Sequence, residues 1–502
     1  MNKYIKNSPL KCSIIAILVL HSVSCNKRLD KNPHDQIYNS SFWHTIDDAD
    51  LALAGVYSTL LCETFSYNQT MLDMIGGDAY TASEQTYLLI ARGQTQPTTG
   101  GIVNNVYYDC YRGIAACNFF MENIDRVSAA DTEKNQYKGE VSFLRALYYF
   151  TLSNFYGGVP LYTKTVSIDE ATVKQSSKAE VLAQVNADLE FAIANLPNTA
   201  YAGHAVKGSA LALKARVLLY SQQWQEAADA ANQVIQDGVF GLNNDYRSMF
   251  LASGQTNNPE IMFSAQYLNP DRYSNQDIII SWFGVLNPND SFVNDFECID
   301  GKPITSSPLY DPADWTKNRD PRLMHTVRVF GEPQINSSGK ENYFYEINPS
   351  ATGWEPMKGV NIDALPMDYS TKSEQDWILL RYADVLLMYA EAKNEVSGPD
   401  ASVYDAINIV RARPGVDMPP ISTGLTKDEM RIRIMHERRV ELGLEGLRYA
   451  DIKRWKTIET YIPSLVDPGG VPRVFNPAKD YLLPFPQSEI DVNPNLEQNS
   501  PY

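Results

Sequence analysis

Residues 207–238 read KGSALALKARVLLYSQQWQEAADAANQVIQDG. Apolar residues recur at helical spacing over 207–220 and again over 224–238, which predicts two helices joined by a tight turn. Alanines recur along both helices, and Tyr220 and Trp224 flank the turn. Small residues where two antiparallel helices cross, with an aromatic residue at the corner, are typical of a tetratricopeptide hairpin. This stretch therefore predicts a fold built on helical hairpins.

Helical periodicity extends from this hairpin toward both ends of the chain. Ser177 and Glu180 form the Ser-x-x-Glu signature of a capping box, and Pro197 follows the end of that helix. Further predicted helices cover residues 48–61, 107–124, 137–156, 177–196, 377–396 and 401–413. The last two would form a second hairpin. Because no strict repeat links the hairpins, we expect a mostly α, tetratricopeptide-like scaffold and not a regular solenoid.

The middle of the chain, residues 243–373, has a different character. Pro, Gly, Asn and aromatic residues crowd together there, and strand-like runs cover only 261–267 and 325–329. An irregular stretch of this length is usually either functional or disordered. Its many aromatic residues argue against disorder, so we expect an ordered, loop-rich segment with a function.

Buried charge is predicted within the second hairpin. Residues 379–392 are apolar nearly all round, which predicts a buried helix. Arg381, Asp384 and Glu391 lie within it, and buried charges are tolerated only when they are paired. The expected partners lie on a neighbouring charged helix and are Glu437, Arg438, Arg439, Glu441 and Arg448.

The amino-acid composition excludes some classes of binding partner. The chain has 502 residues and a formal net charge of −17. This balance argues against nucleic acid, whose recognition needs clustered Lys and Arg, and against a surface that clings to anionic lipid. The 30 tyrosines exceed the 18 phenylalanines, and Tyr serves both in cores and on amphipathic contact surfaces.

The N-terminus reads as a targeting segment. Lys3, Lys6 and Lys11 precede the apolar run 12–20, which is well short of the roughly 20 residues that a membrane-spanning helix needs. The following Ser-Val-Ser-Cys25 resembles a bacterial lipobox, which implies cleavage after residue 24 and a lipid on Cys25. Residue 22 is Ser where Leu or Val is usual, so plain secretion is the alternative. We expect a lipoprotein signal peptide at 1–24 and a tether at 25–40 that is anchored to a membrane by lipid.

Four cysteines remain after this segment: Cys62, Cys110, Cys117 and Cys298. Cys110 and Cys117 would lie about 10 Å apart along a helix, too far for a disulfide. Buried free thiols are therefore expected. No Cys/His cluster occurs, and we expect neither a metal nor another cofactor.

Signatures of catalysis are missing. His436-Glu437 lacks the second histidine of HExxH, and GxSxG, P-loop and GxGxxG motifs do not occur. Glu437 and Glu441 could serve as catalytic acids, but an ion-pair network explains them equally well. A glycosidase carboxylate pair has no sequence motif, so that class stays open. We expect a protein that is not an enzyme.

Several distinctive blocks follow one another along the chain. They include GEVSFLRALYYFTLSNFYGGVPL (139–161), PEIMFSAQY (259–267), NRDPRL (318–323), LLRYADVLLMYAEAKNE (379–395), HERRVELGLEGLRYADIKRW (436–455) and the closing YLLPFPQSEIDVNPNLEQN. Together, in this order, these blocks resemble the SusD/RagB family of surface lipoproteins of the Bacteroidetes, which implies an outer-membrane, lipid-anchored location on the cell surface. The resemblance implies a helical region at 41–240 and a C-terminal SusD/RagB region at 241–502, whose irregular part is 243–373. It also implies a mostly α fold in which tetratricopeptide-like hairpins support an irregular, ligand-facing half.

The function implied by the resemblance is capture of oligosaccharides for a TonB-dependent (SusC-like) outer-membrane transporter. Some family members capture peptides instead, and this stays an alternative. A third hypothesis is an interaction scaffold that uses helical grooves to hold another protein without a small ligand.

Two loop segments have the composition of a sugar-binding surface, which needs exposed aromatic rings beside amides or charged groups. The first holds Asp78, Tyr80, Gln85 and Tyr87, and the second holds Tyr273, Asn275, Trp282 and Phe283. Stacking a ring on a sugar face removes apolar area from water, worth roughly 25 cal/mol per Å². The alternative for each aromatic residue is a packing role. We expect these eight residues to contact the ligand.

Overall fold

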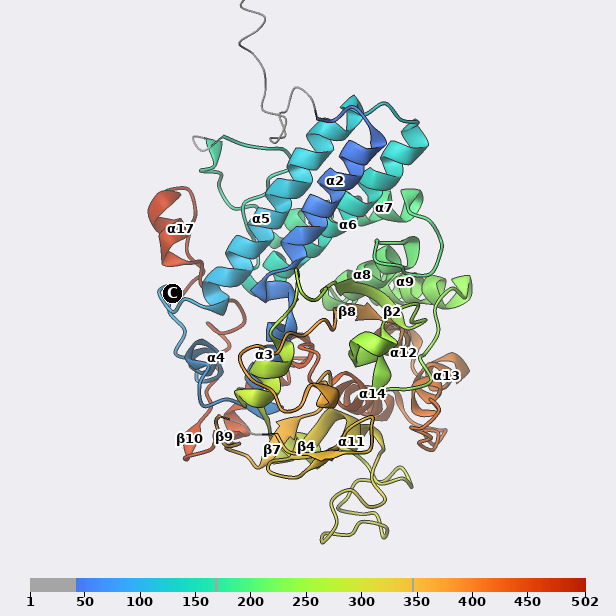
Figure 1. Ribbon diagram of the computed structural model, residues 1–502. Coiled ribbons are helices and arrows are strands. Elements are labelled where there is room, and N and C mark those ends of the chain that lie inside the picture. Colours follow the sequence, from blue (N-terminus) through green and yellow to red (C-terminus); the bar gives the residue numbers. More distant parts are fainter. Residues whose placement is uncertain (1–41, 168–169, 345–346) are drawn as a thin grey trace, which may run out of the picture.

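The structure, a computed structural model, describes residues 42–167, 170–344 and 347–502. The predicted signal peptide, Cys25 and the tether lie outside these ranges. At the top of Figure 1, four helices pack side by side. They are α2 (Ile46–Tyr57), α5 (Ile102–Asn123), α6 (Asp131–Tyr156) and α7 (Lys178–Asn195). Among the described residues, no helix combines the length and apolar character needed to cross a bilayer.

The hairpin predicted at 207–238 is confirmed as α8 (Lys207–Tyr220) and α9 (Trp224–Asp237). The alanines along both helices are buried, so the helices approach closely where they cross. The alanines are Ala210, Ala212, Ala215, Ala227, Ala228, Ala230 and Ala231. Gly238 adopts a left-handed conformation (φ 64°) and ends α9. The capping box of α7 is also confirmed, with Ser177 Oγ accepting from Glu180 N at 3.3 Å.

The second hairpin is α12 (Tyr382–Ser397) with α13 (Ala401–Arg411), followed by α14 (Lys427–Leu442) and α15 (Arg448–Arg454). The prediction of a helix from residue 377 was wrong at its start, because Trp377–Arg381 forms strand β8. β8 pairs antiparallel with β2 (Ile261–Ala265), the strand predicted at 261–267. A short run of apolar residues is compatible with a strand buried on both faces and with a buried helix. Here pairing with β2 stabilises the strand.

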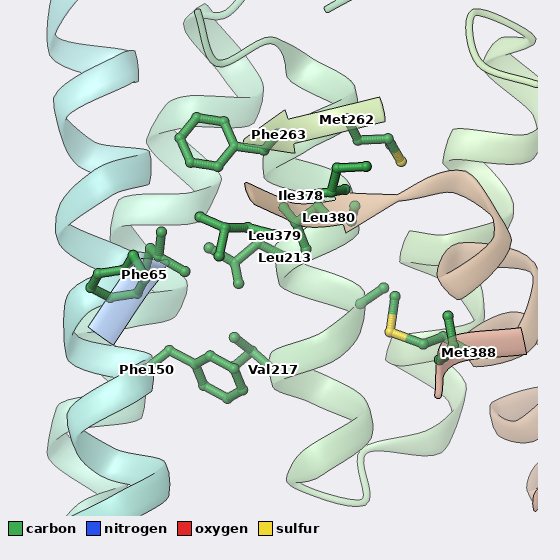
Figure 2. Packing of buried hydrophobic residues seen from close by; sticks show 14 of the residues in the cluster. Phe65, Phe150, Leu213, Val217, Met262, Phe263, Ile378, Leu379, Leu380 and Met388 are labelled. Atoms are coloured by element: carbon green, nitrogen blue, oxygen red, sulfur yellow. The ribbon is translucent and has the colours of Figure 1, made fainter. Parts of the chain in front are cut away.

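The β2–β8 ribbon lies in the centre of the core (Figure 2). Figure 2 shows Met262 and Phe263 of β2 and Ile378, Leu379 and Leu380 of β8 beside the helices. Leu213 and Val217 of α8, Phe150 of α6 and Met388 of α12 are part of the same packing. All ten residues of the two strands are buried, so the ribbon joins the helical half to the loop-rich half.

The loop-rich half holds short elements, most of them drawn in the lower part of Figure 1. They are β1 (Ala79–Tyr80), β3 (Asn287–Pro288), β4 (Val327–Val329), β5 (Gln334–Ile335), β6 (Glu341–Asn342), β7 (Trp354–Pro356), β9 (Val466–Asp467) and β10 (Val471–Pro472), with helices α3 (Thr70–Ile75), α4 (Gln85–Ala91), α10 (Asp290–Val293), α11 (Arg322–Thr326) and α16 (Ile458–Tyr461). The last helix, α17 (Gln487–Val492), lies beside α5 instead. The strand predicted at 325–329 begins at Val327, because His325 belongs to α11. The four cysteines are free thiols, three of them buried, as predicted.

A buried ion-pair network connects these parts. Arg381 Nη1 donates to Glu441 Oε1 and Glu260 Oε1 at 2.7 and 2.8 Å, and its Nε donates to Glu445 at 2.7 Å. Asp384 accepts from Arg438 Nη1 at 2.8 Å and from Arg216 Nη2 at 2.7 Å. The predicted pairing is therefore confirmed for Arg381 with Glu441 and for Asp384 with Arg438. The other three predicted partners pair elsewhere, because Glu437 binds Arg322 and Arg411, and Arg439 and Arg448 lie against Asp78. Glu391 binds Arg454 instead, with Arg438 at 4.0 Å.

We expect Arg381→Ala to lower the free energy of unfolding by about 3–5 kcal/mol, because it leaves three buried carboxylates short of a cation. Denaturant unfolding followed by circular dichroism measures this change. Arg112→Ala is the control, because that side chain is 56% exposed and its pair with Asp109 should contribute about 1 kcal/mol or less. Equal effects of the two substitutions would contradict a structural role for the network.

Candidate functional site

Backbone pairing brings the two predicted site segments together. β1 pairs antiparallel with β3, so that Tyr80 lies opposite Asn287 and Ala79 opposite Pro288. Asn289 N also donates to Asp78 O at 2.8 Å. Segments about 200 residues apart in the sequence thus form one surface region, which the sequence alone could not establish.

Asp78 and Tyr80 form the base of this region. Asp78 is buried, and its Oδ1 accepts from Nε and Nη2 of Arg439 in α14 at 2.9 and 2.7 Å. Tyr80 is buried next to it. In this arrangement Asp78 fixes the start of β1 to α14, and both side chains are buried.

Gln85 and Tyr87 lie at the start of α4, where Gln85 is exposed and Tyr87 is half-buried. Burial raises the pKa of the Tyr87 hydroxyl, and nearby Glu84, Glu63 and Tyr67 raise it further. Tyr67 also packs against the small buried cluster of Ile278, Ile280 and Phe344, on which Trp282 packs as well. Tyr67 therefore connects α4 to the second predicted segment.

The second segment presents an aromatic platform, which we define as Trp282, Phe283 and Tyr369. The ring centroids of Trp282 and Tyr369 are 4.7 Å apart at 88°, and those of Trp282 and Phe283 are 5.1 Å apart. Tyr369 is 77% exposed, whereas Trp282 and Phe283 are half-buried. Sequence reasoning missed Tyr369, because nothing in its neighbourhood shows that it meets Trp282.

A turn of π-helix over Ile278–Trp282 holds Trp282 in place. Its N-terminal flank is fixed by Asp277, which accepts from Asn361 N at 2.7 Å, Ser373 Oγ at 2.8 Å and Gln375 Nε2 at 2.9 Å. Burial raises the pKa of Asp277 in spite of these donors. Single π turns are rare and frequent at functional sites, because they set a side chain at an angle that an α-helix does not allow.

Tyr273 and Asn275 are exposed beside the platform. Ser274 forms an isolated antiparallel bridge with Ser373, and both serines are buried. Alternation along the two extended segments then directs Tyr273 and Asn275 outward, together with Lys372. Lys372 Nζ lies 4.5 Å from the centre of the Tyr273 ring, a cation–π contact that steadies this ring.

The two acids considered as catalytic groups, Glu437 and Glu441, are fully buried. Glu437 pairs with Arg322 at 2.6 Å and with Arg411 at 2.7 Å. Burial alone would raise the pKa of Glu441, but Arg413, Arg381 and Arg322 outweigh it and lower the pKa. Both carboxylates belong to the ion-pair network. Among the described residues, His, Cys, Asp and Glu do not gather in any group of three that could hold a metal.

The structure is thus a helical scaffold that carries clustered aromatic residues beside amides on its loop-rich half. The family model described as the SusD family matches residues 249–502, and a second, described as starch-binding and associating with the outer membrane, matches residues 29–219. The chain therefore belongs to the SusD family.

Known relatives align with this chain over nearly their whole length. SusD-like protein P2 of Formosa agariphila is 28% identical over 505 residues, covering 97% of this chain and 98% of the relative. Starch-binding protein SusD of Bacteroides thetaiotaomicron is 24% identical over 574 residues, covering 100% and 99%. The crystal structure of a SusD-like carbohydrate binding protein from Bacteroides fragilis has a TM-score of 0.81 at 28% identity and covers 91% of this chain and 100% of its own. The predicted family and mostly α fold are thus confirmed.

The carboxyl group of Asp376 has a raised pKa. Asp376 lies directly before β8, and its carboxylate accepts from Tyr267 N at 2.9 Å and Ser264 Oγ at 3.3 Å. Burial raises the pKa of Asp376 from 3.8 to about 6, against the lowering effect of these donors. Because the folded state holds this proton more tightly than the unfolded state, the stability it contributes is complete below pH 3.8 and lost as the pH rises through about 6.

We expect Asp376→Asn to raise the free energy of unfolding at pH 8 by about 1–2 kcal/mol, because the amide keeps an acceptor for Tyr267 N without burying a charge. The gain should shrink to nearly nothing by about pH 4, where the wild-type carboxyl is itself neutral. Denaturant unfolding at both pH values measures the difference. Asp125→Asn, at a carboxylate that is 67% exposed, is the control and should show no such trend. A variant less stable than the wild type at pH 8 would refute the assignment.

Proposed function

We propose that this protein captures oligosaccharides on the aromatic platform and delivers them to a partner TonB-dependent outer-membrane transporter of the SusC-like kind. The observation that carries the proposal is the Trp282–Tyr369 pair, two edge-to-face rings of which one is 77% exposed. A largely exposed tyrosine that packs on a tryptophan adds little to the free energy of folding. We therefore infer that its ring contacts a ligand, because clustered exposed apolar surface marks binding sites.

The chemistry of the platform fits a sugar. Sugar rings have apolar C–H faces that stack on aromatic rings, and removing this area from water is worth roughly 25 cal/mol per Å². Their hydroxyls need both donors and acceptors, and the side-chain amides of Asn275 and Gln85 offer both. Of the predicted contact residues, we propose that Gln85, Tyr87, Tyr273, Asn275, Trp282 and Phe283 meet the ligand, while Asp78 and Tyr80 hold β1 beneath them.

The relatives support the same class of ligand. A Bacteroides thetaiotaomicron relative is named as starch-binding, and a laminarin-binding SusD-like protein shares the fold with a TM-score of 0.70 at 22% identity. We propose binding without catalysis, because Glu437 and Glu441 are occupied by arginines inside the core. Outer-membrane association is part of the description of the family model. Lipid on Cys25 would supply the anchor, and the transporter is the partner that the SusD/RagB resemblance implies.

We expect Tyr369→Ala and Trp282→Ala each to weaken oligosaccharide binding by at least about tenfold, because each removes one stacking surface. Isothermal titration of the soluble chain from residue 26 onward, with malto- and laminari-oligosaccharides and with tryptic peptides, measures affinity and separates glycan from peptide capture. Tyr369→Ala is the cleaner variant, since its exposed side chain adds little to stability.

Tyr108→Ala is the matched control, because Tyr108 is a 43% exposed tyrosine on α5 in the helical half. It should keep full affinity. Binding that survives both platform substitutions would place the ligand elsewhere, and binding of peptides alone would overturn the glycan assignment.

We expect Cys25→Ala to release the protein from the outer membrane into the soluble fraction of its host, because the acyl chains on this thiol are the proposed anchor. Metabolic labelling with palmitate, followed by membrane fractionation, measures this. Cys62→Ala should keep both label and location. A wild-type protein that takes up no label would point to plain secretion.

A further inference from the structure

A cleft that Glu374 and Asp376 line lies on the same chain segment as Tyr369 of the platform, and none of the predicted site residues lines it. It is a cleft of about 620 Å³ between the β2–β8 ribbon and the loops around residues 201–203, 252–257 and 266–272. Its volume falls within the range typical of small-ligand sites, roughly 300–1,000 Å³. Polar and apolar groups line it in similar measure, unlike the aromatic hollow along α5, where apolar groups dominate.

The floor of the cleft is rigid and polar. Asp376 holds Tyr267 N and Ser264 Oγ, and the Tyr201 hydroxyl lies 3.1 Å from Ser264 Oγ. Gln255 binds the backbone of Asp376 in both directions, with its Nε2 donating to Asp376 O at 2.9 Å and its Oε1 accepting from Asp376 N at 2.8 Å. Because these groups are already paired, the floor keeps its shape when a ligand enters.

The rim carries polar side chains that lack such partners. Arg272, Glu374, Asn257 and Thr256 are exposed, and their side chains form no hydrogen bond or ion pair with any other described residue. Tyr267 forms a half-buried aromatic wall beside them. One aromatic surface with a cation, an anion and an amide above it suits a ligand with many hydroxyls and no net charge.

One short segment of the chain contributes to both the cleft and the platform. Tyr369 belongs to the platform, Lys372 covers the ring of Tyr273, and Glu374 and Asp376 line the cleft, all within one short segment. Seven residues span at most about 25 Å when fully extended, which limits the separation of the two places.

We propose that this cleft is a second subsite that takes the distal units of a neutral hexose oligosaccharide whose other end stacks on the platform. The inference rests on the proposed function and adds the size and charge class of the substrate. Arg272 and Glu374 bind hydroxyls at the rim, and Tyr267 stacks on one sugar face. A chain long enough to occupy both places binds more tightly than one that reaches the platform alone, because the second contact is made without a second loss of free translation.

Chain length therefore tests the inference. The probes are laminaritriose with laminarihexaose and maltotriose with maltohexaose, titrated into the soluble chain. For the linkage that binds, we expect the hexasaccharide to bind at least about tenfold more tightly than the trisaccharide, the gain given by two or three further hydrogen bonds. In the double variant Arg272→Ala/Glu374→Ala this ratio should fall below about threefold.

The matched control removes another exposed pair of opposite charges, Asp311 and Lys317, whose side chains are 33% and 56% exposed. Asp311→Ala/Lys317→Ala should keep the wild-type ratio. A ratio that persists in the cleft variant, or a wild-type protein that binds both lengths equally, overturns the second subsite while the proposed function stands. A wild type that binds none of the four probes overturns both.

Discussion

Glu441 is the group on which the rest of the structure depends. Its carboxylate accepts from Arg322 at 2.9 Å and from Arg381 and Arg413 at 2.7 Å each, and these arginines come from α11, β8 and the turn after α13. All four side chains are essentially without solvent. A buried charge that loses its partner costs several kcal/mol, so these segments dock together or not at all. The network therefore fixes the loop-rich half on the helical half.

Helix α14, which contains Glu441, also connects the ion-pair network to the proposed ligand-facing surface. Two residues before Glu441 in α14, Arg439 binds Asp78 at the start of β1. β1 in turn pairs with β3, which closely follows the π turn that presents Trp282. A surface built on such paired groups is arranged before the ligand arrives, and less binding free energy is then lost in ordering it. Asp78, which the composition of its segment predicted to be a ligand contact, instead links the core to the surface.

Part of the site could be predicted from sequence and part could not. The sequence was enough to predict Trp282, Tyr273 and Asn275 as contact residues. They lie in an aromatic and amide-rich segment without helical periodicity, which points to a contact surface. Tyr369 could not be predicted, because its partner Trp282 is far away in the sequence and the contact depends on how two loops close. The composition of the segment around Asp78 and Tyr80 cannot distinguish an exposed contact residue from a buried structural residue. Only the burial of these side chains in the structure makes this distinction.

For the fold, the sequence by itself determined the helices and their hairpins. Spacing, small residues at 210–231 and the cap at Ser177 are local signals, and local hydrogen bonds and packing act on them directly. Only the tertiary structure decided that Trp377–Arg381 is a strand, that β1 meets β3 and that Tyr369 packs against Trp282 and Phe283. Each of these rests on a partner distant along the chain, and a local sequence pattern carries no information about which distant segment will supply it.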